Sequence, residues 1–443
     1  MLPQLLTAIP GPRSRVLAEK LRRHESRNVT FLADDFPVFW QRAEGVNVWD
    51  ADGNRFLDLT SAFGVAGLGH TNAAVRAALV KQAGELLHAM GDVHPTELKA
   101  ELCARLSALT FERWGAGDGK VVLSSSGSDA VETALKTALL RTGKAGVIAF
   151  TGGYHGLGLG ALSAIGLPFF REPFRAQLRD FATLLPYPAE SGGLPDGLRG
   201  QIEAVIRAGG IGSILVEPVQ GRGGCVVPPR EFLPMLRAVC DAHGVQLIAD
   251  EIYTGFNRTG ALFACEHSGV VPDLICLGKA LTGGFPLSAC VGRAEVMDAW
   301  PLSTGEALHT STFLGNPLGC AMALASLQQH ADPALAAHVR ERGAKLKAAL
   351  TGLKSPHVGE IRGLGLMLGV ELLEPATFPP EPATQLALAI IKHALRDGLL
   401  LLADSPTANI LSLTPPFTIS DDEIAFVAAR LQEYLTFLPG SIS

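Results

Sequence analysis

Residues 120–156, KVVLSSSGSDAVETALKTALLRTGKAGVIAFTGGYHG, contain the pattern that decides the fold. An apolar run near each end flanks a segment whose apolar side chains recur at helical spacing, namely Val131, Leu135, Ala138 and Leu139. Short apolar runs that are bounded by glycine and separated by amphipathic helices are typical of a parallel sheet with helices on both faces. The stretch therefore predicts strand, helix and strand, with the four apolar residues forming one buried stripe.

The same alternation continues through the middle of the chain. Apolar runs and a long amphipathic segment follow one another as GSILVEPV (212–219), PPREFLPMLRAVCDAHG (228–244), VQLIADE (245–251) and DLICLGKA (273–280). We therefore predict an α/β protein in which residues 76–334 form a large domain around a mostly parallel central sheet.

The two ends of the chain differ from this pattern. GVNVWDADGNRFLDL (45–59) predicts a hairpin, because Asp52 and Gly53 lie between alternating apolar positions. Residues 335–443 read as helix, strand, helix, strand and helix. We predict a smaller α+β domain formed by residues 335–443, to which the N-terminal segment 1–75 contributes.

The composition limits the classes of partner. Of the 443 residues, 47% are hydrophobic and 18% are charged, and the mean hydropathy is +0.25. This composition is unusually apolar for a soluble monomer. It predicts that a second copy of the chain covers part of the protein's apolar surface. The formal net charge is −6 and the basic residues are dispersed, which excludes a nucleic-acid-binding protein.

The cysteines and the apolar segments predict a cellular location. The seven cysteines are scattered and form no CxxC pair, so they read as small core residues in a reducing compartment. The N-terminal MLPQLLTAIPGPRSR has too short an apolar run for a secretory signal, and Phe150–Phe170 is too rich in glycine to span a bilayer. We predict a cytoplasmic protein without a membrane partner.

Polar residues that follow apolar runs are the first candidates for chemistry, because ligands of open α/β sheets bind beyond the carboxyl ends of the strands. Ser126, Gly127 and Ser128 open a predicted helix, whose free N–H groups and dipole suit a phosphate. The alternative is that Ser126 and Asp129 only cap the helix as a capping box. The residues alone leave both interpretations open.

Three further strand ends carry binding or reactive side chains. Asp250 ends one apolar run, and a carboxylate buried there needs a cationic or hydrogen-bonding partner. Lys279 ends the next run, where partial desolvation would make its amine nucleophilic toward a carbonyl, although a lysine at a strand end is more often solvated. Tyr154 follows a third run and can either stack on a planar ligand or pack in the core.

These four sites together suit one cofactor. Pyridoxal 5'-phosphate (PLP) requires a phosphate site, a carboxylate for its pyridine nitrogen, an aromatic for a ring face and a lysine for its aldehyde. No metal is implied by these residues.

The motifs that hold these residues resemble those of class III aminotransferases of PLP fold type I, over nearly the whole chain. They are SGSDAVETALK, GGYHG, EPVQG, ADEI, GFNRTG, LGKALTGG and TSTFLGNP. The resemblance implies an omega-transaminase that moves an amino group from an amine or amino acid to a keto acid.

The resemblance also implies residue roles. Lys279 would bind the cofactor covalently and act as the general base, and Asp250 would pair with the pyridine nitrogen. The other implied cofactor contacts are Gly127 and Ser128 at the phosphate, Tyr154 and Ile252 on the two ring faces, Glu217 nearby, and Thr312 at the phosphate of the neighbouring subunit. The last contact implies a homodimer with shared active sites, which can assemble further into a tetramer.

Four positions depart from the family pattern. Leu157 and Ser412 stand where relatives that act on ω-amino acids have arginine, Arg222 stands where they have glutamate, and Tyr253 stands where many have glutamine. We hypothesise that Arg222 has taken over carboxylate binding, since a guanidinium pairs with a carboxylate through two parallel hydrogen bonds. The alternative is that Arg222 pairs with a nearby acid on an exposed turn.

Substrate preference follows from the residues expected on the substrate side. Phe63, Tyr154 and Leu157 are expected to line an apolar pocket, which favours amines or apolar amino acids as donors. With Arg222 as the single carboxylate clamp, we expect pyruvate to be a better acceptor than 2-oxoglutarate.

Three rival functions are considered. A PLP-dependent racemase or epimerase of the same fold is the alternative activity. A nucleotide-dependent dehydrogenase is disfavoured, because neither GLGLGAL nor RGLGLMLG matches GxGxxG between a strand and a helix. A non-enzymatic binding role would require Lys279 and Asp250 to be incidental.

Overall fold

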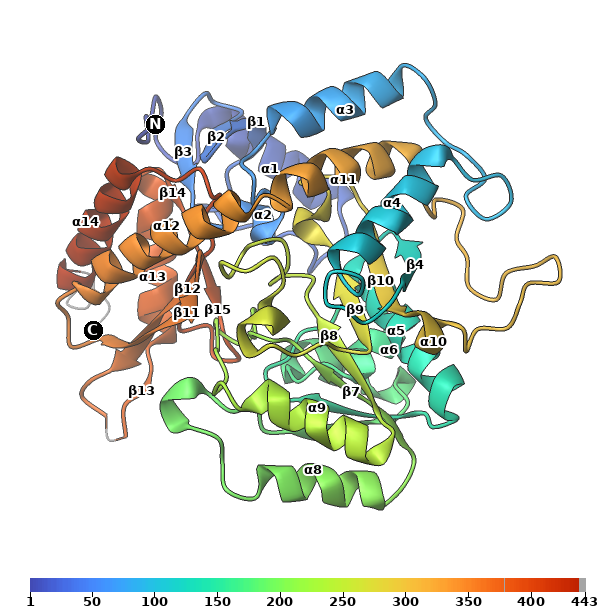
Figure 1. Ribbon diagram of the computed structural model, residues 1–443. Helices are drawn as coiled ribbons and strands as arrows, with labels where there is room; N and C mark the ends of the chain where they lie inside the picture. Colours follow the sequence, from blue (N-terminus) through green and yellow to red (C-terminus); the bar gives the residue numbers. More distant parts are fainter. Residues whose placement is uncertain (378, 438–443) are drawn as a thin grey trace. The chain divides into compact units, whose positions relative to one another are not determined.

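The computed structural model of the protein describes residues 1–377 and 379–437 (Figure 1). The chain divides into a central unit, Ala73–Val339, and a terminal unit made of Met1–Asn72 and Arg340–Ser443. The domain boundaries predicted at residues 75 and 335 remain predictions.

The central unit is built on a seven-stranded sheet, and its strands follow the order β4-β10-β9-β8-β7-β5-β6. In that order they span Gly119–Ser124, Ser288–Arg293, Leu274–Leu277, Gln246–Asp250, Ile211–Val216, Gly146–Phe150 and Ala182–Leu185. The pairs β9·β8, β8·β7, β7·β5 and β5·β6 are parallel, and only β10 runs antiparallel to its two neighbours. The predicted α/β class with a mostly parallel sheet is confirmed.

Helices cover both faces of this sheet. The helices of the central unit are α3 (Ala73–Ala83), α4 (Glu97–Leu109), α5 (Gly127–Thr142), α6 (Leu159–Ser163), α7 (Pro168–Arg171), α8 (Leu198–Arg207), α9 (Phe232–His243), α10 (Ala294–Met297) and α11 (Pro317–His330), and α12 (Pro333–Thr351) begins in this unit and continues into the terminal unit. Short 3-10 helices span Glu172–Gln177, Glu190–Gly192, Ala264–Ser268 and Lys279–Leu281.

Strand β5 shows why its sequence is a continuous apolar run. Ile148 and Phe150 pack into a core cluster with α8 and α9, whereas Val147 and Ala149 pack into a cluster with α5. Successive side chains of a strand point to opposite faces, so a strand covered on both faces needs an apolar residue at every position.

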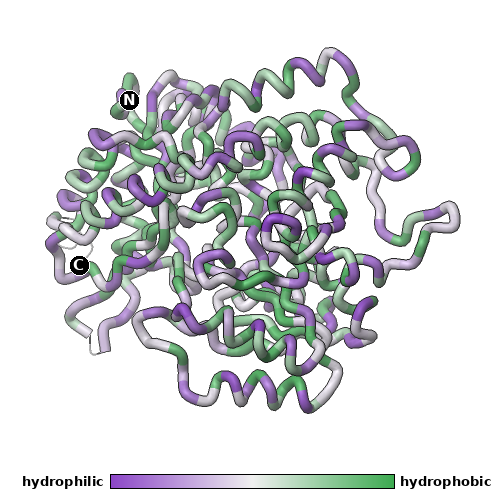
Figure 2. The backbone as a smooth tube through the Cα atoms, viewed as in Figure 1, coloured by the Kyte–Doolittle hydropathy of each residue, from purple (hydrophilic) through white to green (hydrophobic). Residues whose placement is uncertain are grey.

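Helix α8 lies beside α9 at the surface, and hydrophilic and hydrophobic residues alternate along it (Figure 2).

The stripe predicted on α5 is only partly correct. Val131 and Ala138 are buried and Leu135 is partly buried, but Leu139 is 42% exposed. The buried face also contains the small residues Ala130, Thr133, Ala134 and Thr137. Small side chains let the helix approach the sheet closely, and the larger leucine is left at the edge of the contact.

The terminal unit contains two sheets. The first has the order β1 (Trp40–Glu44), β2 (Asn47–Asp50), β3 (Arg55–Asp58) and β14 (Leu399–Leu400). The predicted hairpin is confirmed as the antiparallel pair β2·β3, whose connection contains Gly53 at φ 88°. Strand β14 pairs in parallel with β3, so both ends of the chain share this sheet.

The second sheet has the order β11 (Val358–Leu364), β12 (Met367–Glu374), β16 (Ile410–Leu413) and β15 (Leu402–Asp404), with β13 (Glu381–Pro382) paired to β12. The helices of this unit are α1 (Pro12–His24), α13 (Thr384–Arg396) and α14 (Asp421–Phe437). The first of the two strands predicted within residues 335–443 is instead the hairpin β11·β12. Gly365 adopts φ 57° between the two strands and allows the tight turn.

The terminal unit also contains a left-handed turn, Ser61–Gly64, labelled α2 in Figure 1. Ser61, Ala62 and Phe63 have φ values of 48°, 51° and 63°, and each such residue costs about 1–2 kcal/mol. The buried carboxylate of Asp58 compensates, because it accepts hydrogen bonds from the backbone N–H groups of Thr60 at 2.8 Å and Ala62 at 3.2 Å.

We predict that Ala62→Gly stabilises the protein by about 0.5–1 kcal/mol, because glycine adopts the left-handed conformation without a steric penalty. The midpoint of urea denaturation measures the change. Ala104→Gly, on the exposed side of the regular helix α4, is the control and is expected to destabilise by a similar amount. Equal destabilisation by both changes would contradict strain in the turn.

Candidate active site

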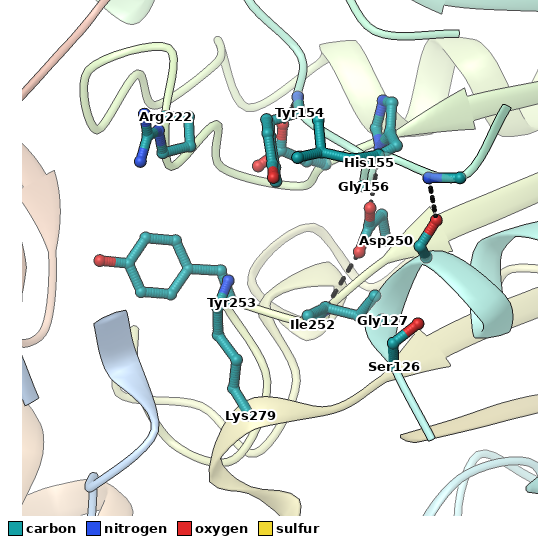
Figure 3. Close-up of a pocket in the computed structure, with 14 residues that line it drawn as sticks. Ser126, Gly127, Tyr154, His155, Gly156, Arg222, Asp250, Ile252, Tyr253 and Lys279 are labelled. Atoms are coloured by element: carbon teal, nitrogen blue, oxygen red, sulfur yellow. Dashed lines mark hydrogen bonds and ion pairs between the residues drawn. The ribbon is translucent and has the colours of Figure 1, made fainter. Parts of the chain in front are cut away.

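A pocket of about 480 Å³ lies in the central unit at the carboxyl ends of the parallel strands. Its lining contains most of the site residues predicted from the sequence (Figure 3). The lining residues are Ser126, Gly127, Ser128, Tyr154, His155, Gly156, Leu157, Gly158, Glu217, Arg222, Asp250, Ile252, Tyr253 and Lys279.

The N-terminus of α5 opens onto the pocket. The backbone N–H of Asp129 donates to Ser126 Oγ at 3.2 Å, so the predicted capping contact is present. Gly127 is the first residue of the helix, and a Cβ there would lie 2.8 Å from Ile252 Cδ1. The close approach of the backbone at this glycine keeps a cradle open at the positive end of the helix, which suits a phosphate.

Asp250 ends β8 and is only 4% exposed. Its Oδ2 lies 2.8 Å from His155 Nδ1, and its Oδ1 accepts a hydrogen bond from the backbone N–H of Ile252 at 3.1 Å (Figure 3). Burial opposes a charged imidazole, but the hydrogen bond and the negative charge of Asp250 outweigh it, and the pKa of His155 is raised.

Glu217 follows β7 and is buried. Its two carboxylate oxygens accept hydrogen bonds from the backbone N–H groups of Tyr154 at 2.9 Å and Gly221 at 3.0 Å. Burial is the main cause that raises its pKa to about 7, and the nearby charge of Asp250 adds to it. The carboxyl group of Glu217 therefore ties the loop that carries Tyr154 to the turn that carries Arg222.

Arg222 lies on this turn and is partly buried. Its guanidinium carbon is 5.7 Å from the ring centroid of Tyr154 and 5.5 Å from that of Phe170, and these two rings contact each other edge to face. Cations are attracted to aromatic faces at such distances. The aromatic pair thus holds the guanidinium at the pocket wall.

Lys279 follows β9 across Gly278 and has a φ of 44°, in the left-handed region. Its Nζ lies 4.2 Å from the ring centroid of Tyr253 (Figure 3). Strained backbone of this kind persists only where the surrounding structure holds it, and it is concentrated at functional sites.

The remaining predicted residues lie elsewhere or at the rim. Leu157 lines the pocket and is 53% exposed. Thr312 is exposed in the loop before α11, outside the lining residues. Phe63 and Ser412 belong to the terminal unit: Phe63 is 57% exposed and lines an apolar pocket of that unit, whereas Ser412 is buried on β16.

His155, which contacts Asp250 in the structure, has no predicted role from the sequence. Its position directly after Tyr154, in the loop that follows a strand, was the available signal. Phe170 gave no signal, because its contact with Arg222 joins residues far apart in sequence.

Comparisons with known proteins decide the family. The family model described as aminotransferase class-III matches residues 31–435. The chain belongs to the class-III aminotransferases. It is therefore a PLP-dependent transaminase, and the fold type I assignment is confirmed.

Three similar proteins cover almost the whole chain. The 4-aminobutyrate aminotransferase of Mycobacterium leprae is 37% identical over 95% of this chain and 95% of its own length. The 5-aminovalerate aminotransferase DavT of Pseudomonas aeruginosa is 36% identical over 93% of this chain and 97% of its own. The structure of an amine transaminase from an uncultivated Pseudomonas species, in its PLP-bound form, has a TM-score of 0.84 at 32% identity and covers 93% of this chain and 98% of its own.

The pocket residues fit PLP. The glycine cradle at the start of α5 suits the phosphate, the buried Asp250 suits a protonated ring nitrogen, and Lys279 reaches the same pocket. Within residues 1–377 and 379–437, no cluster of side chains could hold a metal ion, and no helix is long and apolar enough to cross a membrane. All seven cysteines are free thiols, and all but Cys103 are buried, as expected for core residues.

We predict that Glu217→Gln removes a pH-dependent contribution to stability. The folded-state pKa of Glu217 is about 7 against 4.5 for the free group, so the protonated acid stabilises the fold fully below about pH 4.5. This contribution is lost as the pH rises to about 7 and amounts to about 3 kcal/mol at most. The free energy of unfolding of the wild type, minus that of Glu217→Gln, should fall over this range in cofactor-free protein.

Glu101→Gln, an exposed change on α4, controls for the removal of a carboxylate. A difference between wild type and Glu217→Gln that does not vary with pH would show that Glu217 is ionised throughout.

Proposed function

We propose that this aminotransferase takes an amino group from the end of a donor that carries a carboxylate at its other end, and transfers it to a keto acid. The observation that carries the proposal is the arrangement of Lys279 and Arg222 on one pocket. Among the lining residues, which all belong to the described part of the chain, they are the only lysine and the only arginine. The lysine that would bind the cofactor aldehyde and a guanidinium group that can pair with a carboxylate thus share one cavity.

The names of the relatives support this donor class. 4-Aminobutyrate and 5-aminovalerate each have a terminal amine and a carboxylate separated by a short carbon chain. The two names favour an amino acid of this kind over the amines or apolar amino acids that Phe63, Tyr154 and Leu157 suggested. The relatives do not support the racemase alternative.

The residues have distinct roles in the proposed reaction. When bound, PLP accepts the amino group and stabilises the negative charge that develops as the donor loses a proton. Lys279 would bind the cofactor aldehyde and, once released, would move that proton. Asp250, held by His155, would keep a carboxylate at the ring nitrogen, Gly127 and Ser128 would hold the phosphate, and Tyr154 and Ile252 would enclose the ring.

The acceptor is a keto acid, and we retain pyruvate as the preferred one. The single arginine of the pocket pairs with one carboxylate, and a second carboxylate in 2-oxoglutarate would be desolvated there without a cationic partner. The names of the relatives give no support to this preference. Initial rates with the two acceptors at equal concentration measure it, and faster reaction with 2-oxoglutarate would refute it.

We predict that Arg222→Ala lowers kcat/KM for 5-aminovalerate by about 10- to 100-fold, the loss expected for a charge-assisted hydrogen bond. For pentylamine, which has a methyl group in place of the carboxylate, the change should stay within about twofold. Arg141→Ala, an exposed change on α5, is the matched control. Equal losses for both donors would refute the carboxylate clamp.

We also propose that the enzyme is a cytoplasmic homodimer that can pair further into a tetramer, in which Thr312 reaches the cofactor phosphate of the other subunit. Large apolar side chains are exposed on the central unit near α3 and in the loop before α11, which supports a covered surface. They are Val80, Leu86, Leu87, Met90, Val93, Leu302, Leu308 and Phe313.

Subunit mixing tests the shared site. Thr312→Ala and Lys279→Ala should each impair the site to which the altered residue contributes. A hybrid dimer of the two variants should contain one complete site, because Lys279 of one chain meets Thr312 of the other. Mixed and re-associated subunits should therefore regain activity that neither variant has alone, and no gain would contradict sharing.

A further inference from the structure

Tyr253 places its ring face against the amine of Lys279. The distance from Lys279 Nζ to the ring centroid is 4.2 Å, within the range in which an ammonium group is attracted to an aromatic face (Figure 3). Both side chains line the pocket and both are partly buried. Partial burial strengthens such an attraction, because less water competes for the cation.

The backbone on both sides of Tyr253 is held in place. Asp250 Oδ1 accepts a hydrogen bond from the N–H of Ile252 at 3.1 Å, and the N–H of Gly255 donates to the carbonyl of Glu251 at 2.9 Å. The buried carboxylate of Glu251 also accepts hydrogen bonds from the backbone of Ala264 and Cys265, each at 2.8 Å. The ring is therefore presented from a rigid segment.

Lys279 is held in place as well. It begins a short 3-10 helix in which the N–H of Leu281 donates to the carbonyl of Gly278 at 2.9 Å. Ser326 Oγ donates to the carbonyl of Ala280 at 3.1 Å. Two rigid segments thus bring this ring and this amine together.

We propose that Tyr253 is a positioning residue for Lys279, and that its ring face holds the ammonium form of Lys279 after the released amine has taken the donor's proton. An aromatic face attracts an ammonium group but cannot accept its proton as a base, so the proton stays available for transfer to the substrate. In this proposal the aromatic ring of Tyr253 holds the ammonium group, and the hydroxyl group of Tyr253 has no part in holding it. This inference rests on the proposed role of Lys279 but not on the carboxylate clamp.

The first experiment measures the proton affinity of Lys279 directly. The full-length enzyme is loaded with pyridoxamine phosphate, in which Lys279 is not covalently engaged, and is treated with trinitrobenzenesulfonate from pH 7 to 11. Mass spectrometry quantifies labelling at Lys279, with the exposed Lys20 as an internal control. The midpoint of the pH profile reports proton affinity, and the plateau reports access of the reagent.

Tyr253→Phe, which keeps the ring, should leave the midpoint unchanged. Tyr253→Leu and Tyr253→Met, which remove it, should each lower the midpoint by about half to one pH unit, the effect of a partly buried cation–π contact. The other titratable lining residues, Tyr154, His155, Glu217, Arg222 and Asp250, are the same in all variants. Unchanged midpoints in both non-aromatic variants, or equal shifts in all three, would overturn the proposal.

The second experiment separates positioning from binding during turnover. With a donor deuterated at the carbon that bears the amine, Tyr253→Leu should show a kcat several-fold lower, a larger isotope effect and an unchanged KM. Tyr253→Phe should resemble the wild type in all three. A purely structural loss would lower cofactor retention without enlarging the isotope effect, and this result would also overturn the proposal. If borohydride fails to attach the cofactor to Lys279, the proposed function fails separately.

Discussion

Two carboxyl groups and one imidazole, Glu217, Asp250 and His155, are buried together at one end of the central sheet, and the surrounding loops depend on them. An unpaired charge in such a place would cost several kcal/mol. The structure avoids this cost because His155 comes from one loop to meet Asp250, while backbone N–H groups from two loops meet Glu217. The need to satisfy these groups therefore determines where Tyr154 and Arg222 lie.

Much of this arrangement could be predicted from the sequence, because it follows from local patterns. Continuous apolar runs predicted the parallel strands, and the residues after them predicted one edge of the sheet as the site, where Asp250 and Lys279 now lie. The start of α5 was predicted to bind a phosphate or to be capped, and Ser126 does form the cap. Periodicity failed on α5 itself, where Leu139 is exposed because small residues form the contact face.

The rest depends on contacts between residues that are distant in sequence. Glu217 was expected beside the cofactor, but nothing near it in sequence indicated that its carboxyl group would join two loops. The contact of Tyr253 with Lys279 spans 26 positions of sequence (279 − 253), and neither residue type predicts the other. The left-handed turn at Ala62 contradicts the ordinary preference of alanine and is stabilised by hydrogen bonds to Asp58.

The turn that carries Arg222 has a consequence for how its sequence can evolve. Its backbone is held at Gly221 by Glu217 and at Gln220 by paired hydrogen bonds with Val226, all independent of the side chain at position 222. A single codon change at this position can therefore exchange an acid for a base without remodelling the turn. Insertions or deletions would break those hydrogen bonds, so this position can vary by substitution while the length of the loop stays constant.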